Sequence, residues 1–300
     1  MDLAPASLPQ PPERPIVNGM SVDVEDWFQV GAFENTIARG DWDGCELRVE
    51  RNVERILALF DRAGVKTTFF TLGWIAERVP HTIRKIAEAG HELASHGYDH
   101  QRVFTMDGAA FAEDLRKSRA ILEDAGGVAV TGYRAPSFSI DARNPWAHEE
   151  LAGQGYAYSS SVAPIAHDHY GWREAPRFAF RPVDGADLIE LPVTTAVFRG
   201  RRLAAGGGGF FRTLPYVFSK WAIAQVNRDA REPAIFYFHP WEVDPDQPRA
   251  AGAPMRSRLR HYTNLSAMEG KLEHLLRDFD WGRVDAIAQT ALNSQLREAA

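Results

Sequence analysis

The sequence predicts an α/β protein built on a mostly parallel β-sheet. Short β-rich runs alternate with helix-like segments along the chain. The 300 residues suffice for one large domain, and 45% of them are hydrophobic, so the chain can bury a core without disulfides. A barrel and an open doubly wound sheet both satisfy this alternation, and the pattern alone leaves both open.

The individual segments follow in order along the chain. Residues 15–26 end in alternating apolar and acidic side chains, which predicts a strand. A helix is expected over 48–63, where hydrophobic residues recur at helical spacing and Gly64 follows as a stop signal. The run 65–72 predicts a second strand, and 82–89 predicts a second helix. Further strands are expected at 91–95, 128–133, 156–162, 187–193 and 234–238, and further helices at 107–125, 144–153 and 263–279.

A tetraglycine tract occupies residues 206–209. Glycine has no Cβ, so it permits turns and contacts that other residues exclude. We therefore expect a turn there, or a place where two backbones approach closely.

Composition excludes several classes of protein. The net charge of -6, from 34 basic and 40 acidic residues, argues against electrostatic binding of nucleic acid. No run of 18 apolar residues is present, so we expect no transmembrane segment. The single cysteine, Cys45, excludes an intramolecular disulfide framework. Residues 1–15 hold five prolines and no apolar core, so we interpret them as a flexible arm and expect a cytoplasmic protein.

Polar side chains lie at or just after the ends of the predicted strands. They are Asp23, Glu25, Asp26, His96, His100, Arg134, Ser159 and His239. In parallel α/β folds the carboxyl ends of the strands form one edge, and ligands bind there. We therefore expect these residues, distant in sequence, to meet at one rim.

The segment SHGYDH places His96 and His100 four residues apart. One helical turn would bring both imidazoles to the same side, a geometry that holds one metal ion. The alternative is a pair of capping or surface histidines. His167 and His169 form another close pair in a polar loop, and we expect them to be solvated.

The segment SVDVED supplies three acids at one strand end: Asp23, Glu25 and Asp26. Like charges this close repel unless a cation or hydrogen bonds compensate. A carboxylate that joins two histidines forms a zinc-type site with open positions for water and substrate. A second carboxylate beside the metal is a candidate general base. The alternative is a solvated strand end that leads into a helix cap.

Two further segments carry candidate catalytic groups. GYRAPSFS places Arg134 between a strand and a proline, where it can hold a carboxylate and keep it ionised. IFYFHPWE ends an apolar strand with His239, a candidate general acid. The faces of Trp27, Trp172 and Trp241 can contact sugar rings, although packing is the commoner role of tryptophan.

In this order, SVDVEDW, SHGYDH, RAPSF, YSSSV and FYFHPWE resemble the five motifs of the polysaccharide deacetylase family, the NodB-homology or carbohydrate esterase family 4 enzymes. The resemblance runs from about Val17 to Trp241. It implies a distorted (β/α) barrel, usually of seven strands, with a Zn-type divalent ion and hydrolysis of N-acetyl groups on amino sugars. We thus expect one catalytic domain over 16–300, in which 243–300 forms a C-terminal extension packed on it. The tail HPWEVDPDQPR, with RHYTNL and a final helix, resembles the subgroup associated with bacterial exopolysaccharide and exosortase systems.

The resemblance assigns roles to individual residues. Asp23 matches the catalytic base, Arg134 matches the arginine that orients it, and His239 matches the catalytic acid. His96 and His100 match the two histidine ligands of the metal.

The carboxylate ligand is less direct, because the family's first motif has two adjacent aspartates and this chain has Asp23-Val24-Glu25-Asp26. Alternation along a strand puts Glu25 on the side of Asp23, so Glu25 is the preferred ligand. Asp26 is the alternative, if the chain turns sharply there.

The substrate pocket departs from the family's pattern. Ser137 replaces the aromatic residue of the third motif, and Phe138 follows it. The fourth motif's aspartate is Tyr158 or Ser159 here, and the leucine of the last motif is Tyr237. We expect Ser137, Phe138 and Trp241 to contact the substrate.

The expected function is a metal-dependent hydrolase that removes N-acetyl groups from amino sugars of an exopolysaccharide or its precursor. The expected ion is zinc, with cobalt or manganese as substitutes. A lipid-linked or nucleotide-linked precursor would reconcile a carbohydrate substrate with the cytoplasm. Two alternatives stay open: a cyclic-imide or allantoin-type amidohydrolase, and a non-catalytic glycan-binding protein.

Overall fold

The computed structural model describes residues 15–166 and 171–298 of the chain. The arm expected over 1–15 lies outside the described residues, apart from Pro15, and so do His167 and His169.

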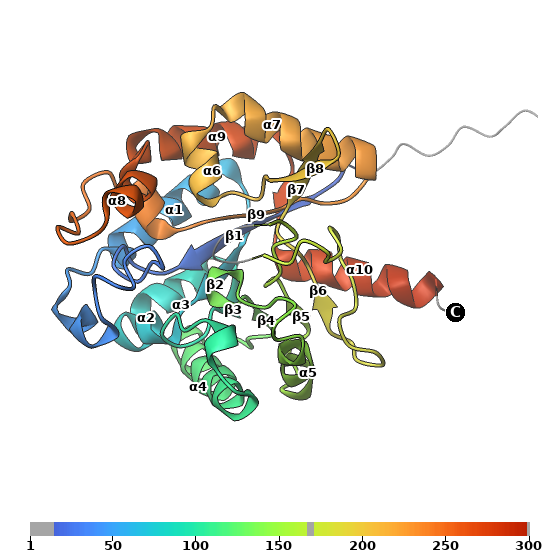
Figure 1. Ribbon diagram of the computed structural model, residues 1–300, viewed down its shortest axis with the longest axis horizontal. Coiled ribbons are helices and arrows are strands. Elements are labelled where there is room, and N and C mark those ends of the chain that lie inside the picture. Colours follow the sequence, from blue (N-terminus) through green and yellow to red (C-terminus); the bar gives the residue numbers. More distant parts are fainter. Residues whose placement is uncertain (1–14, 167–170, 299–300) are drawn as a thin grey trace, which may run out of the picture.

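Eight parallel strands form one sheet in the order β10-β1-β2-β3-β4-β5-β6, with β9 also paired to β1 (Figure 1). The strands are β1 Asn18–Val24, β2 Thr68–Thr71, β3 Glu92–Ser95, β4 Gly132–Tyr133, β5 Tyr158–Ser159, β6 Ile189–Glu190, β9 Ile235–Phe238 and β10 Trp281–Gly282. All seven residues of β1 are buried. This burial is typical of a parallel strand that is covered on both faces.

The sheet curls into a half-barrel, which confirms the distorted (β/α) barrel. Seven strands, β1–β6 and β9, make the curl, and β10 adds a short strand beside β1. On the other edge of β9, the N–H of Thr194 donates to the carbonyl of Ile235 at 3.2 Å, and the N–H of Tyr237 donates to that of Gly206 at 2.7 Å. These loop contacts continue the curl beyond the paired strands.

The glycine tract lies at this contact, and its expected close backbone approach is confirmed. Gly207 has a φ of +119°, and a Cβ there would lie 1.9 Å from the carbonyl oxygen of Tyr237. Any side chain at Gly207 would therefore push the loop away from β9.

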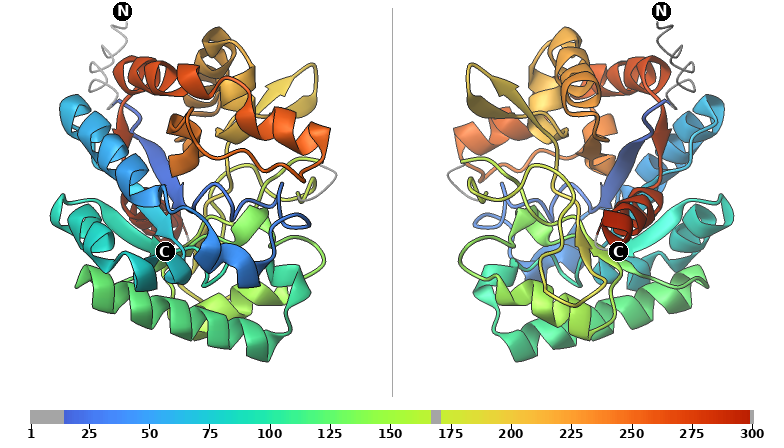
Figure 2. Two further views of the ribbon diagram at one scale, coloured as in Figure 1. Left: turned by 90° about the vertical axis from the view of Figure 1, so that its left-hand side faces the viewer. Right: turned by 90° about the vertical axis from the view of Figure 1, so that its right-hand side faces the viewer.

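Helices surround the curled sheet, with α1, α7 and α9 on one side and α2 to α5 on the other (Figures 1 and 2). They are α1 Val49–Ala63, α2 Gly73–Arg78, α3 Pro80–Glu88, α4 Gly108–Gly126, α5 Trp146–Gly153, α6 Gly208–Thr213, α7 Tyr216–Gln225, α8 Met255–Tyr262, α9 Met268–Asp278 and α10 Val284–Glu298. An antiparallel hairpin of β7 Thr195–Phe198 and β8 Arg201–Ala204 lies against α7. None of the helices in the described parts of the chain has the length and apolar character that crossing a bilayer requires.

The helix expected over 263–279 is shorter than predicted. Asn264 is left-handed, with a φ of +55°, and a 3-10 turn over Leu265–Ala267 precedes α9. The segment 243–300 also does more than pack on the domain, because its strand β10 pairs with Asn18 and Gly19 of β1.

The carboxyl ends of β1, β3, β4 and β9 lie along one edge of the sheet, with β2 between β1 and β3. Val22 is in register with Phe238, and Ser95 is in register with Tyr133. The residues that follow these strands are therefore brought to one edge.

Candidate active site and metal-binding cluster

Three buried side chains converge at this edge: Glu25, His96 and His100. One potential ligand atom of each lies within 4.8 Å of the others. Glu25 follows β1 and His96 follows β3, as the strand-end argument predicted. The helical turn expected for 96–100 is wrong, because the segment is a loop in which Gly97 and His100 have φ angles of +76° and +60°. The loop still brings the two imidazole centroids to 5.6 Å.

The hydrogen bonds of the cluster suit a bound cation. Nδ1 of His96 lies 2.8 Å from the carbonyl of Arg134, so donation there leaves Nε2 as a free lone pair. Burial lowers the pKa of His96 to about 4, so the ring is neutral near pH 7. Oε2 of Glu25 lies 2.8 Å from Nε2 of His100, yet it has no hydrogen-bond partner among the described residues.

A buried carboxylate oxygen without a hydrogen bond is costly unless a cation compensates it. Two imidazoles and one carboxylate are also a donor set typical of catalytic zinc. The residues present therefore fit a divalent ion.

Glu25 is ionised near neutral pH. Burial by itself raises the pKa of this carboxyl, but positive charge on His100 and His239 outweighs burial and lowers the pKa to about 2. Nε1 of Trp241 donates to Oε1 of Glu25 at 3.2 Å. This bond holds Oε1 in place, and Oε2 faces His100.

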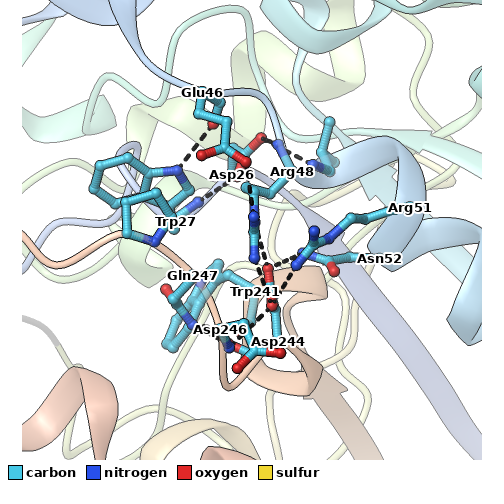
Figure 3. Close-up of polar contacts among 12 residues, drawn as sticks. Asp26, Trp27, Glu46, Arg48, Arg51, Asn52, Trp241, Asp244, Asp246 and Gln247 are labelled. Carbon is cyan, nitrogen blue, oxygen red and sulfur yellow. Dashed lines mark hydrogen bonds and ion pairs between the residues drawn. The ribbon is translucent and has the colours of Figure 1, made fainter.

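Asp26, the alternative ligand, lies outside the cluster and is revised to a structural residue. Its Oδ2 accepts the backbone N–H groups of Arg48 and Val49 at 2.7 and 2.9 Å, at the start of α1 (Figure 3). The guanidinium of Arg48 in turn binds Asp244 at 2.8 and 3.1 Å. Asp26 thereby joins the end of β1 to α1, and Glu25 is the acid of this pair that faces the histidines.

Asp23 is paired with a fully buried arginine. Nη1 of Arg134 donates to Oδ1 of Asp23 and to Oγ of Ser21, both at 2.7 Å. Ser160 holds the rest of the guanidinium, with its carbonyl 3.0 Å from Nε and its hydroxyl 2.9 Å from Nη2. Asp23 is also close enough to His96 for its charge to affect the pKa of that ring. The carboxylate is therefore fixed beside the cluster.

His239 is held by a chain of buried charges. Its Nδ1 lies 2.7 Å from Oε1 of Glu242, and Oε2 of Glu242 accepts from Nε of Arg212 at 2.5 Å. Arg212 also donates to three backbone carbonyls, those of residues 260, 261 and 263. Glu242 and Arg212 are 0% and 1% exposed. We call these three residues, His239, Glu242 and Arg212, the histidine relay.

The relay sets both the orientation and the charge of His239. Because Nδ1 faces Glu242, Nε2 is the nitrogen that faces the cluster, 3.6 Å from Oε1 of Glu25. Burial lowers the pKa of His239, but the carboxylates of Glu25 and Glu242 outweigh it and raise the pKa to about 9. A protonated Nε2 at the rim of the cluster can donate a proton.

Trp241 does not offer a face to a sugar ring. It is stacked between His239, with centroids 5.1 Å apart, and His261, at 4.1 Å. Its expected contact with substrate is revised, because both ring faces are covered and its Nε1 is bonded to Glu25.

The other two expected substrate contacts differ in exposure. Phe138 is buried, with its ring 4.8 Å from that of Tyr237. Ser137 is half-buried and left-handed, with a φ of +54°. Ser137 therefore remains the better candidate for contact with a ligand.

Sequence reasoning missed Glu242, Arg212 and His261. Glu242 had a local signal, because it follows His239 by three residues and Pro240 begins the 3-10 turn over Pro240–Val243, the spacing of a capping box. Arg212 and His261 had none, since they meet the site only through the tertiary fold.

Comparison with known families covers most of the chain in two parts. Residues 41–156 match the family described as polysaccharide deacetylase. Residues 160–289 match a domain of unknown function, DUF3473. Over residues 41–156 the chain is therefore similar to the polysaccharide deacetylase family. Its NodB-like assignment from the five motifs is confirmed.

Individual relatives agree with this assignment. The peptidoglycan deacetylase of Helicobacter pylori is 29% identical over 151 residues, which are 49% of each protein. The peptidoglycan-N-acetylglucosamine deacetylase of Bacillus cereus is 31% identical over 97 residues, 32% of this chain and 35% of that protein. The chain thus spans half or less of the length of these relatives.

One solved structure matches nearly the whole chain. It is a candidate polysaccharide deacetylase from Mycobacterium smegmatis, 22% identical, with a TM-score of 0.62 over 98% of this chain and 96% of that one. At this identity the match shows that the fold is shared.

Proposed function

We propose that the protein is a metal-dependent hydrolase that removes N-acetyl groups from amino sugars of an exopolysaccharide or its precursor. The observation that carries the proposal is the buried cluster of Glu25, His96 and His100 beside a carboxylate fixed by Arg134. A set of metal ligands next to a separate general base and a separate general acid provides the groups that hydrolysis of an amide needs.

The proposed roles follow from the contacts. A divalent ion, when bound by Glu25, His96 and His100, supplies positive charge that acidifies water and polarises an acetyl carbonyl. Asp23 accepts the proton of the attacking water at its carboxylate, and Arg134 keeps that carboxylate in place. A backbone N–H near Ser137 is the candidate donor to the oxyanion.

His239 completes the reaction on the leaving side. The C–N bond of the acetamide breaks, and Nε2 of His239 gives its proton to the departing nitrogen, so that acetate and an amine are released. Glu242 and Arg212 act as positioning residues, because they contact His239 and lie too deep to touch substrate.

The finer features of the proposal rest on sequence resemblance. The tail HPWEVDPDQPR, with RHYTNL and a final helix, resembles that of exopolysaccharide-associated bacterial deacetylases, which favours an exopolysaccharide substrate over cell wall. Zinc is the preferred ion, with cobalt or manganese as substitutes. A cytoplasmic location favours a lipid-linked or nucleotide-linked precursor.

The test is acetate release by purified protein supplied with zinc, and the decisive variant is Asp23→Asn. We expect its turnover to fall at least about a hundredfold, the usual contribution of a general base, with metal content unchanged. Asp41→Asn is the matched control, because Asp41 is an exposed acid. Wild-type rates in Asp23→Asn would contradict the assignment of the base.

A substrate panel separates the proposal from its alternatives. Chito-oligosaccharides and an N-acetylated exopolysaccharide are compared with allantoin under the same conditions. The proposal predicts acetate from the sugars. Ring opening of allantoin without acetate release would favour a cyclic amidase, and sugar binding without any hydrolysis would favour a glycan-binding protein.

A further inference from the structure

A small basic and apolar surface surrounds α8. We call it the α8 surface, and it consists of Arg249, Met255, Arg256, Arg258, Leu259 and Arg260. Met255 and Leu259 are 77% and 63% exposed. They are four residues apart on a helix, so they project from the same side. Together they form a small exposed apolar patch among the arginines.

The charge of this surface is opposite to that of the whole protein. Residues 247–268 contain four arginines and no aspartate or glutamate, in a chain whose net charge is -6. Among the residues that the structure describes, no ion pair joins Arg256, Arg258 or Arg260 to an acid. Arg249 lies over the ring of Tyr262, 4.2 Å from its centroid. The arginines are therefore available to an external anion.

The α8 surface lies next to the candidate active site. His261, in the last turn of α8, stacks on Trp241 at 4.1 Å, and Trp241 stacks on His239. The loop after β1 packs on the same helix, and the ring centroids of Phe33 and His261 are 4.6 Å apart. Figures 1 and 2 show α8 at the outer end of the molecule toward which β1 points. A partner bound to α8 would face the rim of the site.

We propose that the α8 surface docks on an anionic lipid bilayer. Apolar side chains that project between arginines match the interface of such a bilayer. There the apolar side chains insert at the acyl boundary and the arginines contact phosphate headgroups. A soluble polyanion would contact the arginines alone, whereas an anionic bilayer would contact both the arginines and the exposed Met255 and Leu259. The inference goes beyond the proposed function and does not depend on deacetylation.

The experiment is co-sedimentation of the purified chain with large unilamellar vesicles. Wild-type protein is expected to bind vesicles with 30% phosphatidylglycerol more tightly than pure phosphatidylcholine vesicles, and to be released by 0.5 M salt. Arg256→Ser/Arg258→Ser is expected to weaken partitioning by tenfold or more, on the order of fivefold for each arginine. Met255→Ser/Leu259→Ser is expected to weaken it by about tenfold.

Two controls match these variants. Val217→Ser removes an apolar side chain that is 71% exposed on α7, and Arg116→Ser removes an exposed arginine on α4. Both are expected to bind like wild type. All four altered positions of the test variants are exposed or on the helix surface, so their circular dichroism should match that of wild type.

Three outcomes would overturn the proposal. The first is equal or absent binding to the two kinds of vesicle. The second is wild-type partitioning by both double variants. The third is binding to soluble polygalacturonate that depends on the arginines but not on Met255 and Leu259, together with no binding to vesicles, which would make the α8 surface a polyanion site.

Discussion

The histidine relay predicts a specific change in the pH dependence of catalysis. Replacing Glu242 by Gln removes the negative charge 2.7 Å from Nδ1 of His239 while keeping the side chain's size. A charge at this distance typically shifts a pKa by about one to three pH units. Because the negative charge stabilises protonated His239, its removal lowers the pKa of that ring from about 9.

The assay is the pH profile of kcat for acetate release. His239 must carry a proton to act as an acid, so kcat falls as pH rises through its pKa. We expect kcat of the wild type to decline at or below about pH 9. We expect kcat of Glu242→Gln to decline about one to three pH units lower. KM should change little, because Glu242 is fully buried and does not contact substrate.

Glu242→Gln also changes stability, so two further variants, Glu242→Asp and Glu273→Gln, separate the effect of charge from that of packing. Glu242→Gln also leaves Arg212 without its buried partner, which should lower the free energy of unfolding by about 3 kcal/mol. Glu242→Asp keeps the negative charge, so its kcat should decline over the same pH range as that of the wild type, even if the protein is less stable. Glu273→Gln, an exposed acid paired at 3.6 Å with Arg62, is the surface control. A folded Glu242→Gln protein with the wild-type limb and rate would refute the relay.

Two predictions concern stability. Gly207→Ala places a Cβ 1.9 Å from the carbonyl of Tyr237, so we expect urea denaturation to show a loss of at least about 3 kcal/mol. Gly209→Ala meets nothing within 4 Å on α6 and should gain up to about 1 kcal/mol; equal effects of the two substitutions would contradict the close approach at Gly207. Glu92 is buried, and desolvation followed by the charge of Asp285 raises its pKa to about 7. Since the folded form then holds the proton more tightly than the unfolded form, the free energy of unfolding should fall by about 3 kcal/mol between pH 4.5 and 7, and Glu92→Gln should lack this decline. Parallel pH curves for the two proteins would show that Glu92 is not the group responsible.

Local sequence rules predicted the parts of the site that depend on strand geometry. Alternation extended one residue past the end of β1 predicted that Asp23 and Glu25 lie on the same side, and the strand-end rule gathered His96, Arg134 and His239 at one edge. These predictions worked because they follow from the parallel sheet itself and need no knowledge of side-chain packing.

The same rules failed where tertiary contacts decide. The spacing of His96 and His100 suggested a helix, but Gly97 takes a left-handed conformation and makes the segment a loop. The position of Trp241 after a strand predicts contact with a sugar, and only the fold shows that two imidazoles cover its ring. Arg212 reaches the site from a glycine-rich region with no motif.

Strand lengths were also overestimated. The run 128–133 has the composition of a strand, yet only Gly132–Tyr133 pairs, and 156–162 yields only Tyr158–Ser159. Composition shows which residues tolerate an extended backbone, whereas the length of a strand depends on how far its neighbours run alongside it.

The proposed function requires that Glu25, His96 and His100 hold one divalent ion. The most direct measurement is anomalous diffraction at the zinc edge from crystals of the protein grown with zinc. We expect one strong peak, about 2.0 to 2.2 Å from a carboxylate oxygen of Glu25 and from one nitrogen of each histidine, and we expect its loss in Glu25→Gln. A peak bound by Asp26, or a crystal soaked in zinc with no peak between the two histidines, would contradict it.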